Sequence, residues 1–413
     1  MFAPNTARHD SAYAWMRLAA AFAVVTIGSV GWYSMSVALV PVEGEYGVSR
    51  SSASMAYAVT LIGFSIGTLV MGRIVDRVGV FVPLLIGAPG IGAGYALAGI
   101  ASEYWLFLLA HGVLIGVGMS TTFVPMVTDA SLWFQRWRGI AVSICASGNF
   151  LAGAVWPPLL QAFFDRAGWR QSFVGLGAFC LVTLLLLALA FRPRPPADTA
   201  ARVTGESGSG RIQAFNLPPN GVVALLSLAS FACCVVMATP IVHIVAYCTD
   251  RGFAAARGAE MLSVMLGAGV IARVMYGALS DRIGGLYTLL LGSVLQGVGM
   301  LLFLPEPSLS MLYVASGLFG AFQSGLIPAY AVIVREYFPS REAATRISVV
   351  LTSSFVGMAV GGWLSGVIFD VTASYRAAFV STLAWSLTNL SIVLFLVYRG
   401  RSAGRIVAGA SAR

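Results

Sequence analysis

A short polar phrase occurs twice in this chain, about half its length apart. Residues 72–79 read GRIVDRVG, and residues 277–284 read GALSDRIG. Each copy follows an apolar segment of helix length and precedes another. Further matches keep nearly the same offset of 205 or 206 residues, as when Phe164-Asp165 pairs with Phe369-Asp370. Two halves in the same direction predict a duplicated membrane bundle with a pseudo-two-fold axis along the membrane normal, which is typical of secondary transporters.

The composition excludes an ordinary soluble domain. Hydrophobic residues make up 58% of the chain and charged residues only 10%, whereas soluble domains carry about 25% charged residues. Twelve apolar segments are long enough to cross a hydrocarbon core about 30 Å thick as helices. They are residues 17–40, 53–73, 80–100, 105–126, 139–161, 172–191, 220–247, 258–279, 286–304, 309–334, 344–368 and 375–398. The predicted fold is an all-α integral membrane protein with twelve transmembrane helices in two pseudo-symmetric six-helix bundles.

One long polar segment separates the two predicted bundles. It is rich in Pro and Arg and then in Asp, Thr, Ser and Gly, so it cannot bury enough apolar area to fold. We expect an N-terminal bundle at 1–191, a flexible cytoplasmic linker at 192–219, a C-terminal bundle at 220–400 and a cytoplasmic tail at 401–413.

The net charge of +9 reflects the membrane and does not indicate nucleic-acid binding. All 25 basic residues are Arg, and most of them fall on one side of the predicted spans. An excess of basic residues marks the cytoplasmic side, so both termini are expected in the cytoplasm. The Arg-only basicity suggests a GC-rich bacterial genome, which would place this multi-pass protein in the bacterial inner (plasma) membrane.

No motif indicates an enzyme, a metal site or a bound cofactor. The sequence lacks a Walker phosphate loop, a Gly-x-Ser-x-Gly elbow and a His-Glu-x-x-His helix. The five cysteines lie within or at the edge of apolar spans and have no metal-ligand spacing. We therefore expect no catalytic residue, no metal and no cofactor.

The repeated Gly-x-x-x-Asp-Arg-x-Gly loops resemble the signature of the major facilitator superfamily. An Asp at a helix end can accept hydrogen bonds from the exposed amides of the next helix. The Arg can pair with a carboxylate or carbonyl of the facing bundle. Making and breaking these contacts would hold the carrier in one of two states. The predicted latch residues are Gly72, Asp76, Arg77, Gly277, Asp281 and Arg282.

Three stretches are similar to the monocarboxylate transporter and oxalate/formate antiporter branch of that superfamily. They are residues 46–50 (YGVSR), 133–158 (which begin with WFQRWRGIA) and 243–282. The resemblance implies a carrier of small organic carboxylates. The chain departs from the branch in two ways. It has no Lys, which dicarboxylate members place in the eleventh helix and animal carriers near the first, and Gly269 stands where animal carriers have an Asp.

Arg273 is the strongest candidate for binding the substrate. Counted back from Asp281, it lies roughly 12 Å inside the membrane. A cation there costs about 2.5–3.5 kcal/mol on insertion scales and needs a partner or a wet cavity. No acidic residue occurs at comparable depth, so an anionic substrate is a natural counter-charge, which a guanidinium can bind with two hydrogen bonds. The alternative is a structural Arg that extends toward the cytoplasm or bonds carbonyls.

Four uncharged polar side chains are predicted to support Arg273. Asn149 and Gln323 lie deep in the fifth and tenth spans, and each offers a hydrogen bond to a carboxylate or hydroxyl. Tyr33 in the first span and Tyr330 in the tenth offer a phenol. Bonds between helices and ordinary aromatic packing are the alternatives.

Three residues are candidates for proton coupling. His111 and His243 lie in the fourth and seventh spans, which line the central cavity in the resembled fold, and histidine titrates near neutral pH. Asp250 flanks an outer loop and is able to meet Arg273 in one state. The alternatives are buried structural histidines and a solvated carboxylate.

The sequence thus predicts a monomeric secondary transporter of a small organic carboxylate, most simply a monocarboxylate because a single buried cation is evident. It would work in the lipid bilayer by alternating access, coupled to protons or to exchange for a second anion. An efflux carrier for an uncharged or amphipathic molecule, with Arg273 structural, is the alternative.

Overall fold

The computed structural model describes residues 9–193, 215, 217–305 and 308–410. For residues 72, 76, 138, 340, 341, 344 and 401–410 the description is limited to the backbone. Within this part of the chain the regular structure is helical. In chain order the elements are α1 (Ala12–Gly28), η1 (Ser29–Trp32), α2 (Ser34–Tyr46), α3 (Arg50–Val78), α4 (Phe81–Ile100), α5 (Tyr104–Leu109), η2 (Ala110–Gly116), α6 (Val117–Trp133), α7 (Arg138–Ala188), η3 (Leu189–Phe191), α8 (Pro219–Asp250), α9 (Ala255–Ile283), α10 (Gly285–Leu301), α11 (Leu309–Gln323), α12 (Leu326–Tyr337), α13 (Ser340–Thr372) and α14 (Tyr375–Ala410).

The helices agree with the predicted twelve spans. Ten helical segments of the described chain are long and apolar enough to cross a membrane. One of these, residues 139–191, has 53 residues and breaks at Gly168, where φ is 77° and ψ is 159°, so it supplies two crossings. Gly285–Leu301 is a shorter apolar helix and supplies a further crossing.

Three spans are interrupted where the sequence indicated one apolar segment. The first changes to a 3₁₀ turn at Ser29–Trp32, and the fourth passes through a π-helix at Ala110–Gly116. The tenth breaks between α11 and α12. Glycine permits close approach at this break, because a Cβ on Gly325 would lie 2.0 Å from the Tyr276 ring.

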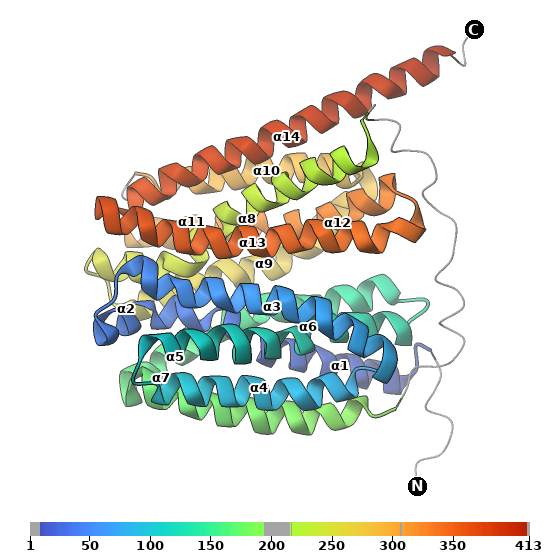
Figure 1. Ribbon diagram of the computed structural model, residues 1–413. Coiled ribbons are helices and arrows are strands. Elements are labelled where there is room, and N and C mark those ends of the chain that lie inside the picture. The colour runs from blue at the N-terminus through green and yellow to red at the C-terminus, as the bar shows by residue number, and fades with distance from the viewer. Residues whose placement is uncertain (1–8, 194–214, 216, 306–307, 411–413) are drawn as a thin grey trace.

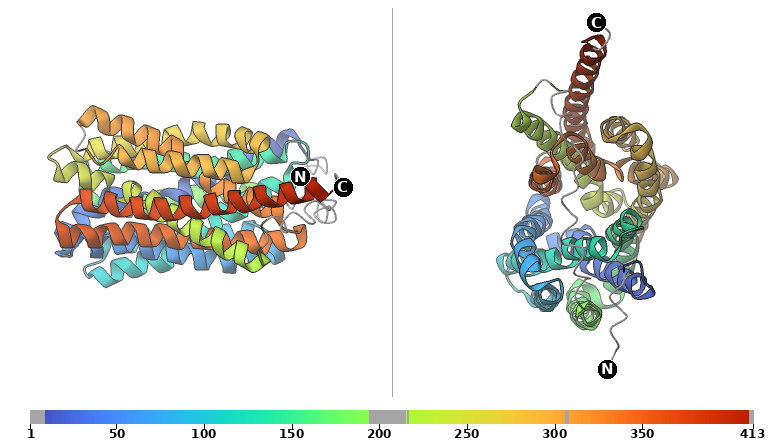
Figure 2. Two further views of the ribbon diagram at one scale, coloured as in Figure 1. Left: turned by 90° about the horizontal axis from the view of Figure 1, so that it is seen from above. Right: turned by 90° about the vertical axis from the view of Figure 1, so that its right-hand side faces the viewer.

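The helices form two bundles that lie side by side (Figure 1). Helices α1–α7 make the N-terminal half and α8–α14 the C-terminal half, and the view along the helices separates the two groups (Figure 2, right). The start of α1 and the end of α14 lie at the same side of the molecule, which we call the termini side; the opposite side is the distal side.

Backbone conformation reveals the pseudo-symmetry independently of sequence identity. Positive φ angles occur at Gly47 and Gly252, at Gly79 and Gly284, and at Gly168 and Ala373. Each pair is separated by 205 residues, the offset of the repeated phrase. Residues with positive φ therefore recur at matched places in the two halves, and the predicted duplicated fold is confirmed.

The two halves contact each other through α3 with α13, α7 with α9 and α2 with α8. One hydrophobic core contains buried residues from both halves. Most of the predicted linker, residues 194–214 and 216, lies outside the described residues, and α8 begins at Pro219. The backbone of α14 continues through the first part of the predicted tail to Ala410.

Candidate substrate-binding site

Arg273 lies in the second half of α9 and is partly buried. Its Cζ atom is 4.7 Å from the centroid of the Phe150 ring on α7, so this contact joins the two halves. In the described part of the chain no carboxylate pairs with Arg273 and no carbonyl accepts a hydrogen bond from it. A cation whose protein partner is a ring keeps its N–H donors free for an anion.

Gly269 makes room for the Phe150 ring one turn before Arg273. A Cβ at Gly269 would lie 2.7 Å from Cδ1 of Phe150 and 3.3 Å from the Gly320 carbonyl oxygen. The position at which the resembled animal carriers have an acidic residue is thus occupied here by the face of an aromatic ring.

Tyr33 and Asn149 lie beside this cation. The Tyr33 hydroxyl donates to Oδ1 of Asn149 at 3.0 Å, and Tyr33 is close enough to Arg273 for the phenol and the guanidinium to interact electrostatically. Asn149 Nδ2 is buried and has no partner among the described residues. The free polar atoms that the two halves bring together here, Nδ2 and the guanidinium nitrogens, are donors, and this favours an acceptor-rich ligand.

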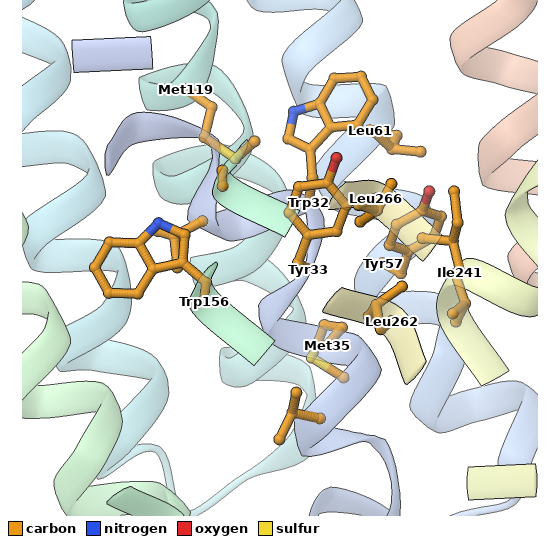
Figure 3. Close-up of a cluster of buried hydrophobic side chains, with 14 of the residues drawn as sticks. Trp32, Tyr33, Met35, Tyr57, Leu61, Met119, Trp156, Ile241, Leu262 and Leu266 are labelled. Carbon is orange, nitrogen blue, oxygen red and sulfur yellow. The ribbon is translucent and has the colours of Figure 1, made fainter. Parts of the chain in front are cut away.

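An apolar cluster drawn from both halves surrounds Tyr33 (Figure 3). Its labelled members are Trp32, Tyr33, Met35, Tyr57, Leu61, Met119, Trp156, Ile241, Leu262 and Leu266, all buried. The Trp32 ring also meets Phe64 of its own half and Phe355 of the other, with centroids 5.3 and 5.6 Å apart. The donors therefore act in surroundings of low polarity, where charge-assisted hydrogen bonds are strong.

Gln323 and Tyr330 have different surroundings. Gln323 is 1% exposed, and neither Nε2 nor Oε1 has a partner among the described residues. Gly269 of α9 packs on Gly320 of α11. Arg273 follows Gly269, and Gln323 follows Gly320, by about one helical turn. Arg273 and Gln323 therefore lie at similar depth. Tyr330 instead donates to Asn389 within the C-terminal half at 2.9 Å, and the structure does not bring it to the Tyr33–Asn149 pair.

His111 is fully buried inside the N-terminal half. Its Nδ1 is 3.2 Å from the Thr60 hydroxyl, and its ring packs 4.6 Å from that of Phe107. These contacts place His111 in an aromatic core and not beside Arg273.

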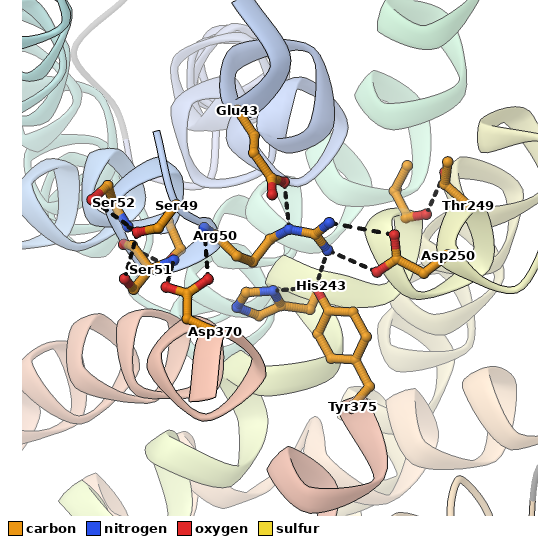
Figure 4. A network of polar contacts seen from close by, with 12 residues as sticks. Glu43, Ser49, Arg50, Ser51, Ser52, His243, Thr249, Asp250, Asp370 and Tyr375 are labelled. Carbon is orange, nitrogen blue, oxygen red and sulfur yellow. Dashed lines mark hydrogen bonds and ion pairs between the residues drawn. The ribbon is translucent and has the colours of Figure 1, made fainter. Parts of the chain in front are cut away.

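A second polar centre joins the halves at the distal side (Figure 4). Arg50, at the start of α3 and 5% exposed, donates through Nε to Glu43 at 2.5 Å. Its two terminal nitrogens bind the Asp250 carboxylate of the C-terminal half at 2.9 and 3.3 Å, and Nη1 donates to the Tyr375 hydroxyl at 2.6 Å. Asp370 accepts from the backbone amides of Arg50 and Ser51 at 2.9 Å each.

We call Glu43, Arg50, Asp250, Asp370 and Tyr375 the distal gate, because their contacts hold the two halves together on that side. Asp250 therefore meets Arg50 in this state and not Arg273. His243 lies beneath the gate, fully buried, with Nδ1 3.0 Å from the Tyr375 hydroxyl and Nε2 2.7 Å from the Gly362 carbonyl oxygen.

The repeated loops end two helices in the same way. The amide of Gly79 closes α3 on the Val75 carbonyl at 2.8 Å, and that of Gly284 closes α9 on the Ser280 carbonyl at 2.9 Å. Arg77 and Arg282 occupy the last turns of these helices, where the negative end of the helix dipole stabilises a cation. Of the other predicted latch residues, Gly277 and Asp281 lie in α9, while Gly72 and Asp76 are described by their backbone only.

Sequence reasoning did not assign roles to Phe150, Arg50 or Tyr375. Phe150 immediately follows the predicted Asn149. In an apolar span, however, the sequence does not distinguish a phenylalanine at a ligand site from one that packs between helices. Arg50 did carry a signal, since it stands at the side where acidic residues gather and basic ones are few.

No group of three or more His, Cys, Asp or Glu side chains suited to a metal ion occurs among the described residues. The five cysteines are buried and unpaired.

Comparison with known proteins gives the family. The model described as "Major Facilitator Superfamily" matches residues 21–284 and 226–412, so both halves are covered. Monocarboxylate transporter 13 of Rattus norvegicus is 26% identical over 398 residues, 94% of this chain and 90% of its own. The agnestins efflux protein AgnL12 of Paecilomyces divaricatus is 24% identical over 329 residues, 79% and 74% of the two chains.

A solved structure shares the fold. A bacterial homologue of the human lysosomal transporter Spinster, in an inward-facing and unoccupied conformation, superposes with a TM-score of 0.69 at 15% identity over 95% of this chain and 97% of that one. The family model, the duplicated twelve-span architecture and these relatives agree, and the chain belongs to the Major Facilitator Superfamily of membrane transporters.

Proposed function

We propose that this transporter carries a small organic monocarboxylate and that Arg273 binds the carboxylate. The observation that carries the proposal is that Arg273, between the two halves, has the Phe150 ring and not an acidic side chain as its partner in the described part of the chain. One guanidinium neutralises one carboxylate, so a monoanion balances the charge of this site.

The neighbouring groups suit such a ligand. Asn149 Nδ2, which the Tyr33–Asn149 hydrogen bond leaves free, supplies a donor for a carboxylate oxygen, and Gln323 adds an unpaired amide at similar depth. The apolar cluster around Tyr33 suits a short hydrocarbon chain. A relative named as a monocarboxylate transporter, aligned over 94% of this chain, supports the same substrate class.

Transport proceeds by alternating access in this proposal. The state described here has its distal gate closed, and the repeated loops at residues 72–79 and 277–284 form the latch when the termini side closes. In this proposal the termini side faces the cytoplasm, which the excess of Arg on that side supports, and the membrane is the inner membrane of a bacterial cell. A monomer is sufficient, and coupling is to protons or to exchange for a second anion.

A second candidate is efflux of an uncharged or amphipathic molecule. A relative named as an efflux protein aligns over 79% of this chain, and the many buried aromatic and aliphatic side chains near Tyr33 suit such a ligand. Arg273 would then serve structure through its contact with Phe150.

The test is uptake of labelled short monocarboxylates into proteoliposomes, with and without an imposed pH gradient, by the native protein and by Arg273→Ala. Arg257→Ala is the matched control, because Arg257 lies on the same helix but is 53% exposed and paired with Glu260. Uptake that is lost in Arg273→Ala and kept in Arg257→Ala supports the proposal. If no carboxylate moves, or if Arg273→Ala transports normally, the efflux candidate takes its place.

A further inference from the structure

The hydrogen bonds around His243 have a defined direction. The Gly362 carbonyl oxygen can only accept, so Nε2 of His243, 2.7 Å away, carries a hydrogen. In a neutral ring Nδ1 then accepts, and its partner at 3.0 Å is the Tyr375 hydroxyl. Since Tyr375 donates to His243, its oxygen is free to accept from Arg50 Nη1 at 2.6 Å. The hydrogen bonds thus form a chain with one direction: Arg50 donates to Tyr375, Tyr375 donates to His243, and His243 donates to Gly362.

Protonation of His243 breaks this order. The added hydrogen on Nδ1 points at the Tyr375 oxygen, so the hydroxyl hydrogen loses its acceptor. The same oxygen then faces two N–H donors that both belong to cations. Because His243 is fully buried, the new charge has no water to screen it from Arg50.

The groups that face His243 offset this charge only in part, because Asp370 attracts it while Arg50 repels it. Arg50 from α3 and Asp370 from α13 act on it electrostatically, and Tyr375 from α14 bonds it directly. Asp370 already accepts from two backbone amides at the start of α3.

The remaining carboxylates of the distal gate are also engaged. Asp250, on the same helix as His243, binds two nitrogens of Arg50, and Glu43 from α2 binds its Nε. Each carboxylate near protonated His243 therefore already accepts hydrogen bonds, either from the Arg50 side chain or from the backbone amides at the start of α3.

The duplication shows that this arrangement is particular to the C-terminal half. Glu45 lies 205 residues before Asp250, and it accepts from Trp169 at 2.5 Å and from Arg170, both within the N-terminal half. The position 205 residues before His243 is Ala38. At the position that matches His243, the N-terminal half therefore has no titratable side chain.

We propose that His243 is a proton-binding site that sets the distal gate: neutral His243 holds the gate closed through Tyr375 and Arg50, and protonated His243 opens it. The proton comes from water on the distal side and takes the lone pair of Nδ1, and the hydrogen bond from Tyr375 is the one that breaks. This inference rests on the proposed function only for the use of the proton as a coupling ion.

The experiment reads the gate directly and contains no substrate. Spin labels are attached to Ser102→Cys and Ala254→Cys, exposed positions in distal loops of the two halves. Pulsed electron paramagnetic resonance measures the distance between the labels in nanodiscs from pH 8 to pH 4. The five native cysteines are buried, so the two introduced thiols are the accessible targets. We expect a single short separation at pH 8 and a longer one that gains population severalfold by pH 4.

His243→Gln is the test variant. Its amide can donate to Gly362 and accept from Tyr375 but cannot take up the proton, so the short separation should persist at every pH. His111→Gln is the matched control, because His111 is equally buried but lies in the other half, away from the gate; it should keep the native response.

Two results would overturn the proposal: a pH response in His243→Gln equal to that of the native protein, or a native separation that does not change between pH 8 and pH 4. If His243→Gln does not fold, Tyr375→Phe takes its place; it removes the hydroxyl that links His243 to Arg50, and an undiminished response there contradicts the mechanism. Failure of carboxylate uptake with an intact gate response would remove the proposed substrate and leave this inference standing.

Discussion

Phe150 and Arg273 face each other across the two halves, with Cζ of the arginine 4.7 Å from the centroid of the ring. A ring face attracts a cation but does not neutralise its charge, in contrast to a carboxylate. Arg273 is therefore oriented by the N-terminal half while its full charge stays available. This explains how a partly buried cation persists in a carrier without an acidic partner for it in the described chain.

Replacing Phe150 with Leu removes the ring and keeps an apolar side chain. Cation–π contacts contribute about 0.5–2 kcal/mol, so we expect KM for a monocarboxylate to rise roughly 2- to 30-fold. Initial-rate uptake into proteoliposomes measures this. An unchanged KM in Phe150→Leu, together with lost uptake in Arg273→Ala, would show that Arg273 acts without help from the ring.

Gly269→Ala tests the same contact from the opposite side. The added Cβ would lie 2.7 Å from Cδ1 of Phe150, closer than van der Waals contact allows, so the ring must move off Arg273. We expect KM to rise as it does in Phe150→Leu. Gly267→Ala on the same helix is the control, because its Cβ meets its nearest atom at 3.9 Å; equal effects of the two alanines would point to a general response of α9.

The twelve spans were predictable because a crossing helix needs an apolar run of a certain length. The duplication was predictable because the phrases at 72–79 and 277–284 keep the same Gly, Asp and Arg positions. The breaks at Ser29–Trp32 and Ala110–Gly116 were not predictable. Hydropathy measures side chains, and an irregular backbone inside an equally apolar segment leaves no trace in it.

The candidate site, too, was predictable only in part. Arg273 stood out because a lone cation in an apolar run is costly, and Asn149 because it is polar at depth. The distal gate could not be assembled from the sequence, since Arg50 meets partners 200 and 325 residues away. Such pairings depend on how the halves dock, and a single sequence records no trace of that.

A buried ion pair stabilises the N-terminal half near the termini side. Arg17 on α1 binds both oxygens of Asp129 on α6 at 2.7 and 2.8 Å and donates to the Ala190 carbonyl at 2.9 Å. The rings of Trp133 and Phe191 each lie 4.8 Å from its Cζ. Both charged side chains are almost completely buried.

Asp129→Asn leaves Arg17 buried without a counter-charge. The cost of breaking such a pair is about 3–5 kcal/mol, so we expect a large fall in Tm, measured by thermal unfolding in detergent. Arg257→Gln breaks the exposed pair with Glu260 and should leave Tm nearly unchanged, because solvent screens an exposed ion pair. The double variant Arg17→Met, Asp129→Leu should recover much of the loss, because it removes both charges; a double variant as unstable as Asp129→Asn would contradict this explanation.

The last prediction uses the repeat as its own control. Gly168 and Ala373 occupy matched turns, but Gly168 has φ 77° and ψ 159°, which only glycine adopts readily, whereas Ala373 has φ 50° and ψ 28°, a left-handed conformation that alanine tolerates at some cost. Gly168→Ala should therefore destabilise the protein by about 1–3 kcal/mol, although no atom lies within 4 Å of the new Cβ.

Ala373→Gly should stabilise it by about 1 kcal/mol, because it removes left-handed strain. Gly175→Ala, also with open space around its Cβ but in a regular helix, should be neutral or slightly stabilising. Thermal unfolding of the three variants separates backbone strain from packing, and a Gly168→Ala protein as stable as Gly175→Ala would show that this turn relaxes without cost.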